Sequence, residues 1–219
     1  MTAVFTPLAI TLKVSLVATA IAVVCGVISA RLLGRRPFPG KDGLEAILTL
    51  PLVMPPTVLG YYLIVLVGRK GLFGQYLWDY FGITLMFTWQ GAAVAAAVVA
   101  FPLVFKSARA AFDSVPHDLE DAARTLGSSE LVIFIRVSLP LALRGVLAGS
   151  MLAMARAMGE FGATLMVAGN LPGKTQTLPL AVYSAVQAGD DTTANILVAV
   201  ISVTCITLLI ITARLVKPK

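Results

Sequence analysis

The sequence predicts an all-α membrane protein, a polytopic bundle of about five transmembrane helices with a short helix outside the membrane. Hydrophobic residues make up 58% of the 219 residues, and charged residues only 13%. Soluble domains average about 45–50% apolar and about 25% charged residues, so the composition favours the membrane class. The apolar residues also gather in long stretches, and we expect residues 1–219 to form a single transmembrane domain.

Charge and the rarer residue types narrow the class further. In a soluble protein the net charge of +6 could indicate nucleic-acid binding, but in a membrane protein it is typical of cytoplasmic loops rich in lysine and arginine. We therefore expect a lipid bilayer around the chain and no nucleic acid partner. His117 is the single histidine, which argues against a histidine-built metal site.

The expected spans are apolar stretches long enough to cross a bilayer core, which takes about 20 helical residues. Five stretches meet this requirement, at residues 8–33, 44–67, 83–105, 138–159 and 193–214. Lysine and arginine are concentrated in the link after the first stretch and in the loop at 106–137, and are sparse in the alternate links. Positive residues favour the cytoplasmic side. The pattern predicts an outside N-terminus and a cytoplasmic C-terminus.

Prolines and charges disturb two of these spans. The second contains Pro51, Pro55 and Pro56, each of which removes a backbone donor. Such breaks are tolerated where neighbouring helices or a cavity satisfy the backbone, so a packing kink and a pathway-lining role remain alternatives. Arg156 and Glu160 lie four residues apart near the outer end of the fourth span. They either face a pathway or form a self-satisfied pair that packs its outer gate.

Small residues in the fourth span indicate close helix packing. Gly145, Gly149, Ala153 and Ala157 recur at steps of four, which lets another helix approach closely. Beyond this span, glycines and prolines interrupt residues 160–192. We expect a partly re-entrant or short-helical stretch there, at the outer end of the bundle.

A polar segment between the third and fourth spans predicts a short cytoplasmic helix at residues 114–127. Ser114 is a plausible cap, and Pro116 suits the first turn. Acidic residues crowd the helix start, where the dipole favours them, and Gly127 is the expected stop. Apolar residues fall at helical spacing between these ends: Leu119, Ala122, Ala123 and Leu126. An amphipathic linker on lipid is the alternative, but anionic lipid would repel an acidic segment, which favours a protein partner.

This segment resembles the EAA loop of bacterial ABC importer permeases. Asp121-Ala122-Ala123 is followed by Gly127 and later by Leu139-Pro140, with Asp121 in place of the usual Glu and Val137 in place of the usual Ile. Both replacements keep charge or shape. Residues 50–60, 156–164 and 169–179 resemble the molybdate permeases within the molybdate, sulfate and tungstate branch of that family.

The resemblance implies a type I ABC importer permease in the bacterial cytoplasmic (inner) membrane. It implies a homodimer that works with two cytoplasmic ABC ATPase subunits and an extracytoplasmic oxyanion-binding protein. Molybdate is the expected cargo, with sulfate, thiosulfate and tungstate as alternatives. The expected ATPase-coupling residues are Leu119, Glu120, Asp121, Ala122, Ala123, Leu126, Gly127, Leu139 and Pro140. The residues considered for a pathway or gate are Pro55, Pro56, Arg156 and Glu160.

No enzyme activity is expected of this chain. Residues 168–175 fit a loose phosphate-loop pattern, but Pro172 removes a backbone donor that such a loop needs, and the predicted topology places it outside. ATP and magnesium are therefore expected in the partner ATPase, and no cofactor in this chain. An intramembrane enzyme would need a nucleophile with a base, or metal ligands, and no such set is visible. A membrane scaffold without transport is the remaining alternative class.

Overall fold

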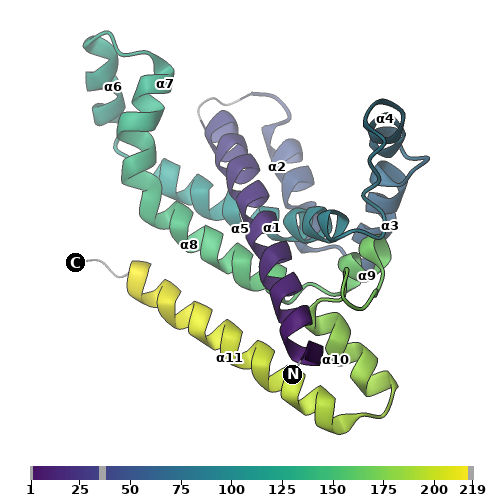
Figure 1. The fold of residues 1–219 in the computed structure, drawn as a ribbon. Coiled ribbons are helices and arrows are strands. Elements are labelled where there is room, and N and C mark those ends of the chain that lie inside the picture. Colours follow the sequence, from purple (N-terminus) through teal and green to yellow (C-terminus); the bar gives the residue numbers. More distant parts are fainter. Residues whose placement is uncertain (1, 35–37, 217–219) are drawn as a thin grey trace.

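A computed structural model describes residues 2–34 and 38–216, and every regular element in these two ranges is helical (Figure 1). In chain order the elements are α1 (Thr2–Gly34), α2 (Lys41–Thr49), the 3-10 turn η1 (Leu50–Leu52), α3 (Pro56–Val67), α4 (Leu72–Phe81), α5 (Trp89–Asp113), α6 (His117–Thr125), α7 (Glu130–Ile133), the π-helical turn η2 (Phe134–Ser138), α8 (Leu139–Met158), α9 (Gly162–Ala168), α10 (Leu178–Gln187) and α11 (Asp191–Val216).

Four helical stretches in the described residues are long and apolar enough to cross a membrane. They are Val4–Gly34, Trp89–Asp113, Glu130–Met158 and Asp191–Ile211. A fifth is reached only when the bent pair Lys41–Leu52 and Pro56–Val67 is counted as one span. These stretches confirm the all-helical membrane bundle with four to five spans.

The predicted second span at 44–67 is sharply bent at its prolines. Its two halves meet at 110°, so the chain turns sharply between η1 and α3. Proline is the physical reason, because the residue before a proline is driven out of the helical region. Pro55 precedes Pro56 and has an extended ψ of 135°, which ends one helix and starts the next.

The third and fourth spans are displaced from the predicted ranges. The third was expected at 83–105, but α5 begins at Trp89 because the Thr88 hydroxyl accepts a hydrogen bond from Gly91 N at 3.1 Å and caps the helix. It then runs on to Asp113. The fourth was expected at 138–159, but its helical path starts at Glu130 and continues through η2 into α8. The non-spanning loop is therefore shorter than the predicted 106–137.

Small side chains form the centre of the bundle, where α5 crosses α1 and α8. The most apolar window of α5 is 67% buried, against 11% for that of α11, so α5 is the central helix. A Cβ atom built on Gly149 of α8 would lie 2.5 Å from the Cβ of Ser107 in α5, so only glycine allows this approach. Alanines dominate the core cluster around the crossing: Ala18, Ala22, Ala92, Ala96, Ala100, Ala153 and Ala157.

Residues 160–192 form short helices, as the interrupted sequence predicted. α9 and α10 are joined by a loop, and Leu178 N at the start of α10 donates a hydrogen bond of 2.7 Å to Thr11 Oγ1 of α1. Asp190 then caps α11 through a 3.0 Å hydrogen bond from Thr193 N. These contacts fasten the segment to the end of the bundle that holds the N-terminal half of α1.

Candidate functional site

The loop between α5 and α8 projects from one end of the bundle. Figure 1 shows α6 and α7 beyond the ends of α1 and α5, well away from α10. We call this the loop end of the bundle. The loop's short helix begins later than predicted, at His117, because Ser114 belongs to the last turn of α5 and Pro116 has an extended ψ of 125°.

The end of α6 is closed by a glycine turn. Gly127 has a φ of +78°, a left-handed conformation that favours glycine. Ser128 N donates to Ala123 O at 3.1 Å, and Gly127 N donates to Arg124 O at 2.9 Å. This pair of bonds is a Schellman motif, which satisfies the last carbonyls of the helix and reverses the chain. The predicted stop at Gly127 is confirmed, and α7 starts three residues later.

The apolar residues of α6 form a low, outward-facing surface. We call Leu119, Ala122, Ala123 and Leu126 the apolar ridge. Leu126 is 85% exposed, Leu119 and Ala122 are exposed, and Ala123 is half-buried. Leu131 on α7 is also exposed and was not singled out from the sequence. An apolar surface kept out of the bundle is available to another molecule.

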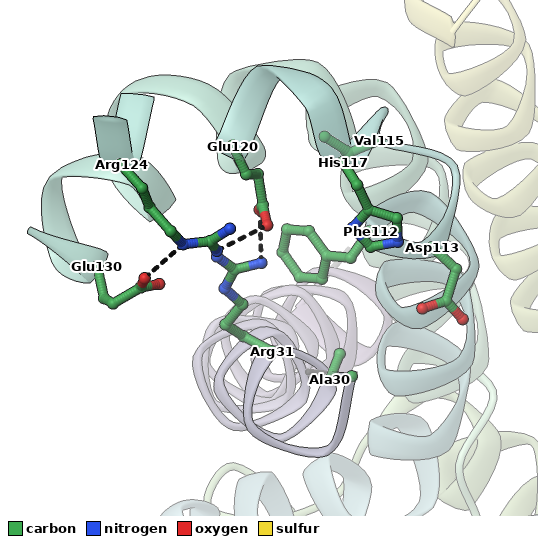
Figure 2. A pocket seen from close by; sticks show the side chains of 10 residues that line it. Ala30, Arg31, Phe112, Asp113, Val115, His117, Glu120, Arg124 and Glu130 are labelled. Atoms are coloured by element: carbon green, nitrogen blue, oxygen red, sulfur yellow. Dashed lines mark hydrogen bonds and ion pairs between the residues drawn. The ribbon is translucent and has the colours of Figure 1, made fainter. Parts of the chain in front are cut away.

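Glu120, the residue after Leu119, is buried and points into the protein. Figure 2 shows its carboxylate meeting Arg31 of α1, with Arg124 beside them. The Arg31 Nη1 to Glu120 Oε1 distance is 2.9 Å, and the Ser138 hydroxyl donates a hydrogen bond to the same oxygen. Arg124 Nη2 approaches Glu120 Oε2 at 3.4 Å. Glu120 therefore does not share the exposed surface of the other predicted coupling residues.

The neighbouring charges of the loop are arranged around Arg124. Its Nε donates to Glu130 Oε1 at 2.7 Å, and its Nη1 donates to Asp121. The hydrogen bond to Glu130 is the main cause that raises the pKa of Arg124 above its ordinary value, and Asp121 adds to it. The guanidinium thus stays charged and joins α6 to α7. Arg124 and Glu130 line a polar cavity of about 530 Å³ between α1 and the loop.

The two remaining predicted coupling residues lie at the start of α8. Leu139 is half-buried against the core cluster that contains Ala30 and Phe105, whereas Pro140 is exposed. Pro140 falls in the first turn of α8, where the missing N–H costs little. These residues connect the loop to a spanning helix.

Arg156 and Glu160 form an ion pair where α8 ends. Arg156 Nη1 lies 2.8 Å from Glu160 Oε2, and their side chains are 34% and 1% exposed. The other Glu160 oxygen accepts a 2.9 Å hydrogen bond from Ala163 N and so caps α9. The carboxylate therefore has an ion pair at one oxygen and a hydrogen bond at the other, while the arginine side chain is partly exposed.

The prolines of the bend lie against the same region. A Cβ built on Gly162 would stand 2.8 Å from Pro56 Cβ, and one built on Gly60 would stand 2.6 Å from Met166 Cβ. Helices α3 and α9 therefore pack with almost no side chain between them. The structure brings the region of Pro55 and Pro56 next to that of Arg156 and Glu160, although 100 residues separate Pro56 from Arg156.

Two residues of the loop end escaped sequence reasoning. Arg31 entered the predictions only as part of the first expected span, 8–33, and Ser138 only as the start of the fourth. Arg31 precedes Glu120 by 89 residues, and no local pattern pairs them. A charged residue in the last turn of a spanning helix was the one available signal.

The chain belongs to the family described as binding-protein-dependent transport system inner membrane components. The family model matches residues 22–219, which include the whole loop and the C-terminal part of α1. The chain is therefore a membrane permease of that transporter class, and a multi-pass inner membrane protein.

Within the family, relatives with a stated substrate are similar over most of the chain. The molybdenum transport system permease protein ModB of Escherichia coli is 45% identical over 203 residues, 92% of this chain and 89% of that protein. The putative molybdenum transport system permease protein YvgM of Bacillus subtilis is 45% identical over 87% of this chain and 84% of that protein. The sulfate transport system permease protein CysT of Salmonella typhimurium is 35% identical over 88% of this chain and 69% of that protein.

Solved structures share the fold at low sequence identity. A chain of the MetNI methionine ABC transporter in an inward-facing conformation superposes with a TM-score of 0.75 at 19% identity, covering 97% of this chain and 94% of that chain. A chain of a bacterial alginate ABC transporter has a TM-score of 0.72 at 12% identity, covering 97% of this chain and 78% of that chain. The fold is that of a type I ABC importer permease.

Proposed function

We propose that the chain is the membrane-spanning permease subunit of an ATP-driven importer of molybdate. The observation that carries this proposal is 45% identity to a molybdenum permease over 92% of the chain, with the loop included. The lower identity to sulfate permeases supports molybdate over sulfate. The subunit carries out no reaction itself and moves its cargo by alternating between two arrangements of helices.

The apolar ridge of α6 is the docking surface for a separate ATPase. Its small, exposed side chains fit a groove on a soluble partner, and Asp121 is a further exposed residue of α6 that carries a charge. ATP and magnesium are bound by the ATPase, and no cofactor by this chain. The loop keeps its structure through internal contacts of Glu120, Leu139 and the glycine turn at Gly127. Pro140 is exposed at the start of α8.

The working assembly is a homodimer of this chain with two ATPases and an extracytoplasmic oxyanion-binding protein. The apolar window of α11 is only 11% buried within one copy, which leaves its surface for lipid and a second copy. Arginines are gathered at the loop end, and the positive-inside tendency supports a cytoplasmic location for that end, with the N-terminus outside and the C-terminus inside.

Arg156 lies at the pathway, and Glu160 holds its orientation. The open face of Arg156 suits transient contact with a dianion, since weak contacts favour passage over trapping. Pro55 and Pro56 keep the chain broken beside this pair, where α9 packs on the bend.

Reconstitution in lipid tests the proposal. The purified permease is combined with an ABC ATPase and an oxyanion-binding protein from the same organism, and ATP turnover is measured with molybdate, tungstate, sulfate or thiosulfate. Molybdate should stimulate turnover and accumulate in the vesicles. Stimulation by sulfate or thiosulfate alone would replace molybdate with that cargo, and failure of any ATPase to associate would favour a scaffold without transport.

A further inference from the structure

We propose that Glu120 is a positioning residue that ties the docking helix α6 to α1 as well as to α8. In this arrangement, movement of the loop reaches two spanning helices at once. The inference rests on the proposed function, because it concerns how the force of the ATPase enters the bundle. Glu120 is assigned no contact with the ATPase or the anion.

The contacts of one carboxylate support this role. Oε1 of Glu120 receives Arg31 Nη1 at 2.9 Å from α1 and the Ser138 hydroxyl from the end of η2. Oε2 faces Arg124 Nη2 at 3.4 Å within α6. Three segments of the chain, α1, α6 and η2, therefore meet at one side chain, as Figure 2 shows for Arg31 and Arg124.

The burial of the junction separates it from the docking surface. The Glu120 side chain is 8% exposed and that of Arg31 is 14% exposed, whereas Asp121, the next residue, is 66% exposed. A partner that covers the apolar ridge would not reach the Glu120 carboxylate. Ion pairs removed from water are screened little and hold their geometry better than surface pairs.

The path of the backbone explains why a side-chain bridge is needed. α6 is joined to the bundle by the short links at 114–116 and 126–129, and its backbone lies close to α7 and η2. The bridge from Glu120 to Arg31 extends this attachment to α1, whose last turn lies under the loop. The Arg31 guanidinium also stands 5.4 Å from the Phe134 ring of η2, so its position is fixed from a second side.

Ser138 connects the bridge to the fourth span. It is fully buried and is the last residue of a π-helical turn, immediately before α8. Such a turn inserts an additional residue into a helix and often occurs at functional positions. Here it lies where the Ser138 hydroxyl reaches Glu120, so α8 and α1 share one acceptor oxygen.

The test compares uptake with ATP turnover in the reconstituted complex. Glu120→Gln keeps the shape of the side chain and removes its charge. We expect ATP turnover to stay within about twofold and anion uptake per ATP to fall about tenfold, within the range of measured coupling free energies. Asp113→Asn is the matched control, because it removes one negative charge at the same end from a pair within α5. It should leave uptake per ATP unchanged.

A distance measurement separates a linkage from general destabilisation. Spin labels are attached through Asp118→Cys on α6 and Leu32→Cys on α1, in a background with Cys25→Ser and Cys205→Ser. With Glu120 present, the label distance should stay the same when nucleotide is added. In Glu120→Gln it should broaden and change with nucleotide by several ångströms. An unchanged, narrow distance in the variant would overturn the proposal.

If Glu120→Gln assembles poorly, exchanging the charges of Arg31 and Glu120 provides a second test of the bridge. Arg31→Glu alone should uncouple the complex, and Arg31→Glu with Glu120→Arg should recover part of the uptake. No recovery, with both proteins assembled, would contradict the bridge. If the unaltered complex shows no anion-stimulated turnover, the proposed function fails first; if it is active and the Glu120 variants match it, only the bridge fails.

Discussion

At the scale of single residues, two adjacent acidic side chains of the loop lie in opposite environments, one exposed and one buried. Asp121 is exposed and shares Arg124 with Glu130, whereas Glu120 is buried against Arg31 and Ser138. One helical step turns the side chain by about a quarter of a turn, and this separates a surface group from an internal one. Of these two adjacent acidic side chains, only Asp121 is therefore accessible to another molecule.

The first prediction concerns Ala123 within the apolar ridge. Ala123→Glu places a long charged side chain on a surface suited to close contact, so we expect ATPase binding and anion uptake to be lost. Because the site is half-buried at most, the free energy of unfolding should change by about 0.5 kcal/mol or less. Co-purification with the ATPase and thermal melting in detergent measure the two effects. Normal coupling in this variant would show that the ridge is not the docking surface.

The second prediction concerns the ion pair at the end of α8. Glu160→Ala removes the partner of Arg156 and the cap of α9 together, so we expect a loss of about 2–3 kcal/mol in stability. Glu160→Gln can still accept the hydrogen bond from Ala163 N and should lose less than half of that. Denaturation of the purified permease gives the comparison, and equal losses would mean that capping contributes nothing.

Transport by Arg156→Gln then distinguishes the two roles of the pair. A pathway role predicts reduced anion uptake at a normal protein level, because the exposed face of the guanidinium is lost. Unchanged uptake would leave the pair with a packing role alone.

At the scale of elements, the sequence predicts helices well where local chemistry decides their ends. Gly127 ends α6 because only its left-handed conformation allows the two closing hydrogen bonds. The start of α6 was misplaced because Ser114 could cap α6 or finish α5, and packing of α5 decided between them. The bend at Pro55 was visible, but its 110° angle depends on contact between α3 and α9, which sequence spacing does not reveal.

The third prediction tests the close packing of α5 and α8. A Cβ on Gly149 would overlap the Ser107 side chain, and one on Gly145 would lie 2.5 Å from Ala111 Cβ. Gly149→Leu should therefore destabilise the permease by about 1–3 kcal/mol through overpacking. In α2, nothing lies within 4 Å of a Cβ on Gly43, so Gly43→Ala should stabilise by about 0.5–1 kcal/mol. A Gly149 variant as stable as the parent would refute the close contact.

At the scale of the whole molecule, composition predicted the class and the resemblance predicted the family. The bridge between Arg31 and Glu120 was beyond sequence reasoning because it depends on how α1 crosses α5 and ends beneath α6. The same crossing separates two ends of the bundle. α6 lies by the last turns of α1 and α5, whereas Lys174 lines a pocket with Lys13 and Trp89 from their early turns.

The fourth prediction assigns these ends to the two sides of the membrane. Single cysteines are introduced by Asp118→Cys on α6 and Lys174→Cys at the opposite end, both at exposed positions, after Cys25→Ser and Cys205→Ser. Positive residues keep the loop end inside, so an impermeant maleimide added to spheroplasts should label the position 174 variant about tenfold more than the position 118 variant. Permeabilised cells that lack the ATPase should label both equally. The reverse pattern in spheroplasts would place the docking loop outside the cell and exclude a cytoplasmic ATPase as its partner.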